Sequence, residues 1–134
     1  MLTLADVIGA LWPSSLPAAL ARASGAICLD GVYIDSRQAA AHSLFVALPG
    51  ERTDGHRYVS AAFARGAVAA LVERPPEEAA TVVDTLRAVA PACLVPPIAV
   101  VVPDTLRALQ KVAQALRATR GDLTVVGVTG SVGK

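Results

Sequence analysis

The residues with the clearest chemical potential stand at the C-terminal end of the sequence, in the run Thr129-Gly130-Ser131-Val132-Gly133-Lys134. Glycines allow backbone N–H groups to converge on an anion, and a lysine adds a positive charge beside them. The preceding run, Leu123–Val128, is apolar and rich in β-branched residues, which is typical of a strand buried in a parallel sheet. We therefore predict that a nucleotide phosphate binds at Thr129, Gly130, Ser131, Gly133 and Lys134.

This turn matches only part of the phosphate-loop pattern, which reads Gly, four residues and then Gly-Lys-Ser/Thr. Val128 occupies the first glycine position, and the sequence ends on Lys134, before the position of the hydroxyl residue. The helix whose N-terminus usually strengthens such a site is not part of the sequence either. A tight turn whose lysine contacts only water is the alternative interpretation.

Two earlier polar segments also carry side chains suited to a ligand, and each follows an apolar run. Asp35-Ser36-Arg37 offers an acceptor, a hydroxyl and a guanidinium, which can bind phosphate or carboxylate through two parallel hydrogen bonds. The second segment is Glu51-Arg52-Thr53-Asp54-Gly55-His56. Ligands of open α/β sheets bind in loops beyond the carboxyl ends of the strands. From spacing alone, an Asx-turn with a surface arginine and a helix-capping loop are the favoured interpretations.

Other chemistry is not indicated. His42 and His56 are too isolated to form a metal site, and no carboxylate pair or nucleophile motif is present. The two cysteines, Cys28 and Cys93, match no metal or redox spacing, and we expect both to be buried, reduced thiols. We predict no catalytic residue and no metal ligand within this sequence.

The composition predicts a folded protein of one domain or slightly more. The chain has 134 residues, of which 54% are hydrophobic. Twelve basic residues against 11 acidic ones, with only 4% aromatic residues, argue against a nucleic-acid-binding surface. No apolar run approaches the roughly 20 residues that cross a bilayer, and the N-terminal stretch lacks the positive charges of a signal peptide. We expect a monomeric cytoplasmic protein.

The elements that position these residues follow from the hydrophobic pattern. β-Branched or continuous apolar runs predict strands at 32–34, 44–48, 67–72, 98–102 and 123–128. Helical spacing predicts a first helix capped by Thr3 and Asp6 and stopped by Pro13, a short one at 18–23, and one capped by Thr53 or Asp54 that ends at Gly66. Two more helices are predicted at Glu77–Ala90 and from Pro103-Asp104 to Gly121.

Alternating strands and helices predict an α/β fold with parallel strand pairing. We expect a small N-terminal mixed α/β sheet domain, followed by the first helix and strand of a second, P-loop-type domain. The boundary is predicted within 96–103, which gives domains of residues 1–102 and 103–134.

Three motifs in order resemble the Mur ligase family. Asp35-Ser36-Arg37, then Ser43-Leu-Phe-Val-Ala-Leu-Pro-Gly-Glu-Arg-Thr-Asp-Gly-His56, then Ala61-Ala-Phe-Ala-Arg-Gly-Ala67 are similar to the N-terminal domain of these enzymes. Val128–Lys134 looks like the ATP-binding loop that opens their central domain. The resemblance covers residues 32–134. It implies an ATP- and Mg²⁺-dependent ligase that extends the peptide of a peptidoglycan precursor in the bacterial cytoplasm.

Two branches of the family fit this sequence. Leu48-Pro-Gly-Glu-Arg52 and Thr129-Gly-Ser131 favour the branch that adds D-alanyl-D-alanine to UDP-N-acetylmuramoyl-tripeptide through an acyl phosphate. The branch that adds the third amino acid shares Asp-Ser-Arg and is the alternative, as is a non-catalytic module that binds a UDP-sugar. An unrelated P-loop ATPase or GTPase is a further alternative.

The resemblance also assigns roles to residues. It implies that Ser36, Arg37, Glu51, Arg52 and Thr53 bind the UDP end of the substrate, and that the glycine-rich turn with Lys134 holds the β- and γ-phosphates of ATP. The family usually has Gly-Asp where this chain has His42-Ser43, so we expect that turn to differ. Because the metal-binding residues of the central domain are absent, the 134-residue chain alone is expected to be inactive.

Overall fold

A six-stranded parallel sheet forms the centre of the computed structural model, which describes residues 2–49, 55–91, 93–119 and 125–126. Its strand order is β6-β7-β5-β4-β3-β8. The strands are β3 (Gly31–Tyr33), β4 (Ser43–Val46), β5 (Ala69–Val72), β6 (Thr81–Asp84), β7 (Ile98–Val101) and β8 (Val125–Val126). Every neighbouring pair is parallel, so the carboxyl ends of all six strands lie along one edge. The predicted α/β fold with parallel pairing is confirmed.

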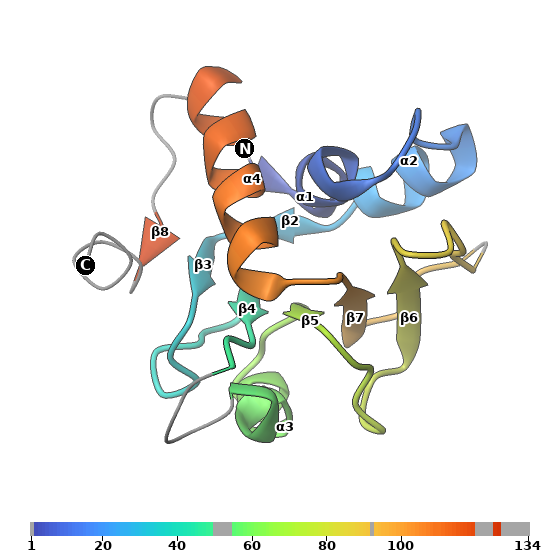
Figure 1. The fold of residues 1–134 in the computed structure, drawn as a ribbon. Helices are drawn as coiled ribbons and strands as arrows, with labels where there is room; N and C mark the ends of the chain where they lie inside the picture. The colour runs from blue at the N-terminus through green and yellow to red at the C-terminus, as the bar shows by residue number, and fades with distance from the viewer. Residues whose placement is uncertain (1, 50–54, 92, 120–124, 127–134) are drawn as a thin grey trace.

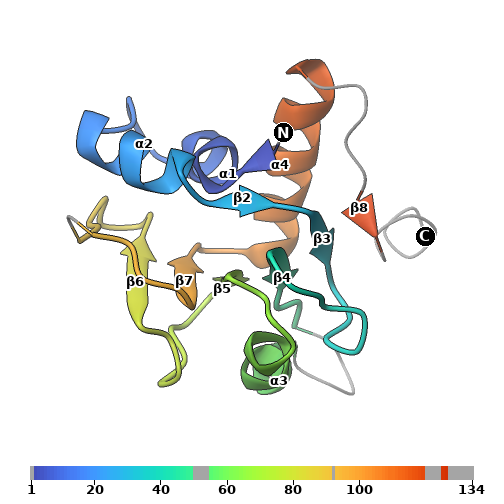
Figure 2. The ribbon, with the colours of Figure 1, turned by 180° about the vertical axis from the view of Figure 1, so that it is seen from behind.

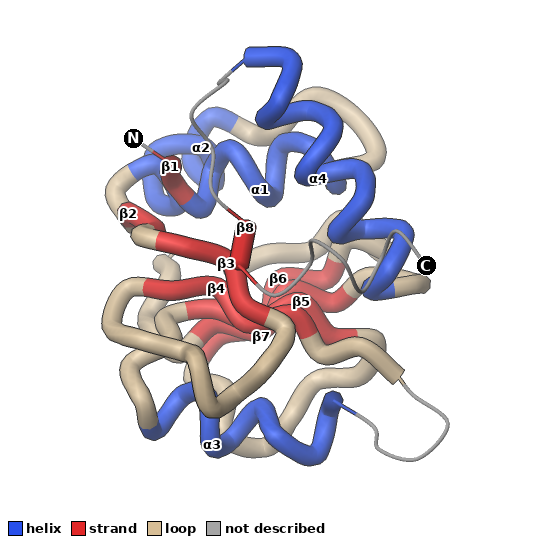
Figure 3. Tube along the Cα trace, turned by 90° about the vertical axis from the view of Figure 1, so that its left-hand side faces the viewer, coloured by secondary structure: helices blue, strands red, loops and turns tan. Residues whose placement is uncertain are grey.

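Helices cover both faces of this sheet, which gives three layers (Figure 3). On one face lie α1 (Leu4–Leu11), α2 (Ala18–Gly25) and α4 (Thr105–Thr119), as Figures 1 and 2 show from opposite sides. The other face is covered by α3 (Val59–Ala64), which follows the short 3-10 helix η1 (Gly55–Tyr58). Outside the sheet, β1 (Leu2–Thr3) pairs antiparallel with β2 (Cys28–Leu29).

The sheet is buried because helices cover both of its faces. Every residue of β4, β5 and β7 is buried, as the continuous apolar runs predicted. Side chains such as Leu44, Leu71 and Ile98 belong to a core shared with α1 and α4, whereas Phe45 and Ala70 belong to the core beneath α3. Successive strand residues therefore serve opposite layers.

The first helix begins and ends where its sequence predicts. The backbone N–H of Thr3 donates to Oδ2 of Asp6 over 2.9 Å, and the Thr3 hydroxyl donates to the same oxygen over 3.2 Å. Asp6 also places a negative charge in the first turn, where it interacts favourably with the positive end of the helix dipole. α1 ends at Leu11, two residues before Pro13, because proline cannot continue a helix.

The predicted helix at Glu77–Ala90 is wrong. Residues Thr81–Asp84 instead form β6, the edge strand beside β7, and a turn follows over 85–88. Val83 is fully buried while its neighbour Val82 is 38% exposed, which is the alternation of a strand. Val82, Val83 and Leu86 have helical spacing, but pairing with β7 and β-branched residues favour the strand.

The predicted helix after Pro103 is confirmed as α4. Ala108, Leu109 and Val112 are buried in the core with α1, whereas Leu106 is 40% exposed. The predicted end at Gly121 lies outside the described residues. At the far edge of the sheet, Val125 and Val126 pair with Val32 and Tyr33, so this part of the predicted strand 123–128 is confirmed.

The two cysteines correct a second expectation. Cys28 and Cys93 are both exposed free thiols rather than buried ones. Cys28 lies on the two-residue strand β2, and its neighbour Leu29 is buried, so the two side chains point to opposite faces of the strand.

The turn before β4 has a backbone conformation that glycine usually adopts. His42 has a φ of 61°, and its carbonyl accepts a hydrogen bond from the Asp30 N–H over 2.7 Å. Histidine tolerates this left-handed region better than most residues with a side chain. Gly66, which ends the turn after α3, has a φ of 110°, as expected for a glycine at a helix end.

Candidate functional site

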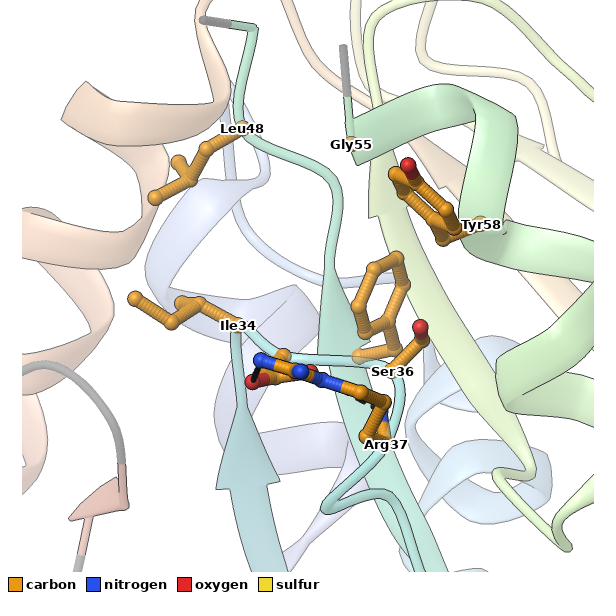
Figure 4. Close-up of a pocket in the computed structure, with 8 residues that line it drawn as sticks. Ile34, Ser36, Arg37, Leu48, Gly55 and Tyr58 are labelled. Atoms are coloured by element: carbon orange, nitrogen blue, oxygen red, sulfur yellow. Dashed lines mark hydrogen bonds and ion pairs between the residues drawn. The ribbon is translucent and has the colours of Figure 1, made fainter. Parts of the chain in front are cut away.

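A cavity of about 490 Å³ lies beyond the carboxyl ends of β3 and β4 (Figure 4). The first segment that enters it, Ile34–Arg37, follows β3 directly. Two further parts of its wall are Leu48, which follows β4, and the start of η1. The cavity is lined by Ile34, Asp35, Ser36, Arg37, Phe45, Leu48, Gly55 and Tyr58. Parallel strands thus bring two segments, predicted separately from the sequence, to one place.

Asp35 determines how Arg37 is held. The Arg37 N–H donates to Oδ1 of Asp35 over 2.9 Å, which forms the predicted Asx-turn. The guanidinium then donates from Nε to Oδ1 over 3.1 Å and from Nη2 to Oδ2 over 2.8 Å. A guanidinium carries five N–H donors, so about three remain available to an anion. The Arg37 side chain is 84% exposed, and these donors can reach a ligand from solution.

The same contacts shift both ionisation equilibria. The hydrogen bonds from Arg37 hold the pKa of the Asp35 carboxyl below its ordinary value, and the charges of Arg37 and Arg65 add to this effect. Asp35 in turn raises the pKa of Arg37. Both groups are therefore charged at neutral pH, and an anion would meet a guanidinium whose orientation is already fixed.

The cavity has a polar side and an apolar side. Figure 4 shows Ser36 and Tyr58 on one side and Ile34 and Leu48 pointing away from them. Ile34 and Leu48 pack against the core that contains Ala108 and Leu109 of α4. The ring of Tyr58, 42% exposed, gives the polar side a flat surface on which a planar group can stack.

The base of the second predicted loop is closed at the cavity. The Gly55 N–H donates to the carbonyl of Leu48 over 2.8 Å. A Cβ at Gly55 would lie 2.6 Å from the Leu48 nitrogen, so only glycine allows this close approach. Glu51, Arg52, Thr53 and Asp54 lie outside the described residues. The N-cap position of α3 is Tyr58, so the predicted cap at Thr53 or Asp54 is wrong for this helix. The sequence nevertheless places them between two residues that line the cavity.

His56 links this loop to the centre of the sheet. Its Nε2 accepts a hydrogen bond from the backbone N–H of Glu73, just after β5, over 2.8 Å. Oε2 of Glu73 accepts from the backbone N–H and the hydroxyl of Thr105, over 3.1 and 3.2 Å. His56 therefore joins η1 to the residue after β5, and Glu73 supplies an acceptor for the first turn of α4.

Of the predicted site residues, the structure brings Ser36 and Arg37 together in the cavity. The predicted phosphate-binding residues Thr129, Gly130, Ser131, Gly133 and Lys134 lie outside the described residues. Sequence reasoning missed Tyr58, Phe45, Ile34 and Leu48 as cavity residues. Tyr58 follows His56 by two residues, and this aromatic next to a polar loop was the available signal.

Within the described part of the chain, no group of three or more His, Cys, Asp or Glu side chains is placed to hold a metal ion. Among the same residues, no helix is long and apolar enough to cross a membrane.

Comparison with known proteins adds to this geometry. The sequence profile described as "Mur ligase family, catalytic domain" matches residues 29–117. A UDP-N-acetylmuramoyl-tripeptide–D-alanyl-D-alanine ligase of Bacillus subtilis is 39% identical over 110 residues, which cover 79% of this chain and 20% of the relative. A UDP-N-acetylmuramoyl-L-alanyl-D-glutamate–2,6-diaminopimelate ligase of Bacteroides fragilis is 37% identical over 107 residues, covering 79% and 19%.

A solved structure is also similar. The crystal structure of MurF from Acinetobacter baumannii superimposes with a TM-score of 0.58 at 26% identity, covering 87% of this chain and 21% of that one. The chain thus spans about a fifth of the length of the proteins that it matches.

Proposed function

Since the chain belongs to the Mur ligase family, we propose that it binds the UDP end of UDP-N-acetylmuramoyl-tripeptide, as part of a ligase that adds D-alanyl-D-alanine in peptidoglycan precursor synthesis. Residues 1–102 form the substrate-binding domain in this proposal, and residues 103–134 open the ATP-binding domain. The similarity to ligases named for this reaction supports the assignment.

The cavity beyond β3 and β4 is the observation on which the proposal depends. It combines an oriented arginine, a hydroxyl and an exposed aromatic ring, and a uridine diphosphate group offers a matching anion, ribose hydroxyls and planar base. Arg37 would bind the diphosphate through the donors that Asp35 leaves available. Ser36 would bind a polar atom of the same ligand, and Tyr58 would stack on the base.

The remaining predicted contacts complete this assignment. Glu51, Arg52 and Thr53 would contact the ligand from the loop that leaves the cavity at Leu48 and returns at Gly55. Thr129, Gly130, Ser131, Gly133 and Lys134 would hold ATP phosphates in the complete enzyme. When bound there with Mg²⁺, ATP supplies the activation that amide-bond formation requires. We propose a monomeric, cytoplasmic enzyme that binds no nucleic acid, and we expect the 134-residue chain to lack ligase activity by itself.

Calorimetric titration with UDP-N-acetylmuramoyl-tripeptide tests the proposal. Arg37→Ala should weaken binding about tenfold, since a charged hydrogen bond to phosphate would be lost. Arg37→Lys should recover only part of the affinity because an ammonium cannot donate two parallel hydrogen bonds. Arg22→Ala, an exposed arginine on α2, is the matched control. Equal affinities of Arg37→Ala and the wild-type protein would contradict the proposed role.

The diaminopimelate-adding branch is the second candidate, because a relative named for that reaction has nearly the same identity. The two substrates differ in peptide length while sharing the UDP end. Steady-state assays of the complete parent enzyme with UDP-N-acetylmuramoyl-dipeptide or -tripeptide, and with each amine, separate the two. Turnover of the dipeptide with diaminopimelate would select this alternative.

A further inference from the structure

We propose that Glu73 is a positioning residue that couples the cavity beyond β3 and β4 to the N-terminus of α4. The effect of Glu73 on affinity for the UDP end of the substrate rests on the proposed function. The link that Glu73 makes between η1 and α4 does not depend on any ligand.

Glu73 contacts two separate segments of the chain through different groups. Its backbone N–H donates to Nε2 of His56 over 2.8 Å, and Oε2 of its carboxylate accepts both the N–H and the hydroxyl of Thr105. His56 lies in η1, between the cavity residues Gly55 and Tyr58. Thr105 is the first residue of α4. One residue therefore joins η1 to α4.

The hydrogen bonds of Glu73 to Thr105 and to His56 each depend on the burial or the protonation of the partner group. The Thr105 side chain is fully buried, so its hydroxyl and N–H need a protein acceptor. Glu73 is half-buried beyond the end of β5, where its carboxylate also faces the positive end of the α4 dipole. His56 can accept at Nε2 only when that nitrogen carries no proton, which leaves Nδ1 as the N–H of the neutral ring.

The position of α4 affects the cavity because the helix supports its apolar wall. Ile34 and Leu48 line the cavity and pack against the core to which Ala108, Leu109 and Val112 of α4 contribute. A shift of the first turns of α4 would move this wall relative to Arg37. Glu73 thus affects the apolar wall of the cavity through its contact with Thr105 of α4. It affects the side formed by η1 through its contact with His56.

Hydrogen exchange of the Thr105 amide tests the structural link. Glu73→Ala should raise its exchange rate about tenfold, because the N–H loses its acceptor. Glu73→Gln should restore most of the protection, since the amide oxygen accepts the same hydrogen bonds. His56→Ala should also raise the exchange rate of Thr105, although His56 belongs to the other segment. Unchanged exchange at Thr105 in His56→Ala would overturn the coupling.

Affinity for UDP, measured calorimetrically under conditions where each variant is folded, tests the consequence. Asp104→Ala is the matched control, because Asp104 accepts the Arg107 N–H over 3.1 Å at the same helix end, whereas the Thr105 N–H donates to Glu73. We expect Glu73→Ala to weaken UDP binding several-fold and Glu73→Gln and Asp104→Ala to leave it near the wild-type value. Equal losses in Glu73→Ala and Asp104→Ala would assign the effect to helix stability and overturn the positioning role. If the wild-type protein binds no UDP, the proposed function fails, and the exchange of Thr105 still decides the link.

Discussion

Arg37 owes its place in the cavity to a carboxylate two residues before it. The hydrogen bonds from Arg37 to Asp35 restrict a side chain that would otherwise adopt many rotamers in water. Because the Arg37 side chain is ordered before any ligand binds, binding does not incur the entropy cost of ordering it. The pair therefore contributes orientation more than net charge, because Asp35 offsets the positive charge that it positions.

The ionisation of Asp35 gives a direct test of this pair. Because the pKa of Asp35 is lowered from 3.8, its ionised form contributes stability fully above that value. This contribution is lost as the pH falls through the lower folded-state pKa. In a carboxyl ¹³C NMR titration, Arg37→Ala should raise the pKa of Asp35 toward 3.8, whereas Arg22→Ala should leave it unchanged. The same pKa for Asp35 in the wild-type protein and Arg37→Ala would contradict the pairing.

The sequence predicted part of the geometry at this site. The Asx-turn at Asp35 is confirmed, and Ser36 and Arg37 both line the cavity, whereas their role in ligand binding stays a prediction. Tyr58 was missed although an aromatic residue two positions after His56 was a signal. Its place in the same cavity as Ser36 depends on the pairing of β3 with β4, and the local sequence around Tyr58 does not show which strands are neighbours.

Among the elements, β6 shows how tertiary contacts decide between a helix and a strand. Thr81–Asp84 alternates buried and exposed side chains, yet apolar residues before and after it also fit helical spacing. In the structure, β7 provides hydrogen bonds along one edge of this segment, and the core accepts Val83. β5 and β7 were predicted correctly, because a short continuous apolar run favoured a strand over a helix at these positions.

Two neighbouring valines distinguish the strand from the predicted helix. Val83→Ala should lower the free energy of unfolding by about 2 kcal/mol, because a fully buried side chain is truncated. Val82→Ala should cost less than about 1 kcal/mol, since that side chain is 38% exposed. Urea denaturation of both variants provides the comparison. Similar losses at the two positions would favour the helix, in which both residues belong to one apolar face.

For the whole molecule, α4 follows the predicted boundary at 102/103 but packs against residues that precede it. The chain leaves β7, crosses the face of the sheet as α4 and reaches β8 beside β3 at the opposite edge (Figure 1). Leu109 and Val112 share a core with Leu4 and Ile8 of α1. The domain division remains a prediction, but the helix that opens the second domain contributes to the core of the first.

Truncation of a single α4 side chain tests this shared core. Leu109→Ala should destabilise the protein by about 3 kcal/mol and leave one cooperative unfolding transition. Leu106→Ala is the matched control on the same helix, and we expect a loss below about 1 kcal/mol because Leu106 is 40% exposed. If α4 unfolded separately, Leu109→Ala would instead leave the main transition in place.

The central claim is that the cavity beyond β3 and β4 binds the UDP end of the substrate. An ¹⁵N–¹H NMR titration of the 134-residue protein with UDP tests this most directly, because it reports the location of binding as well as its strength. We predict saturable shifts at the amides of Ser36, Arg37 and Tyr58, with little change along α2. An absence of shifts at these residues, or saturable shifts confined to another part of the molecule, would contradict the account.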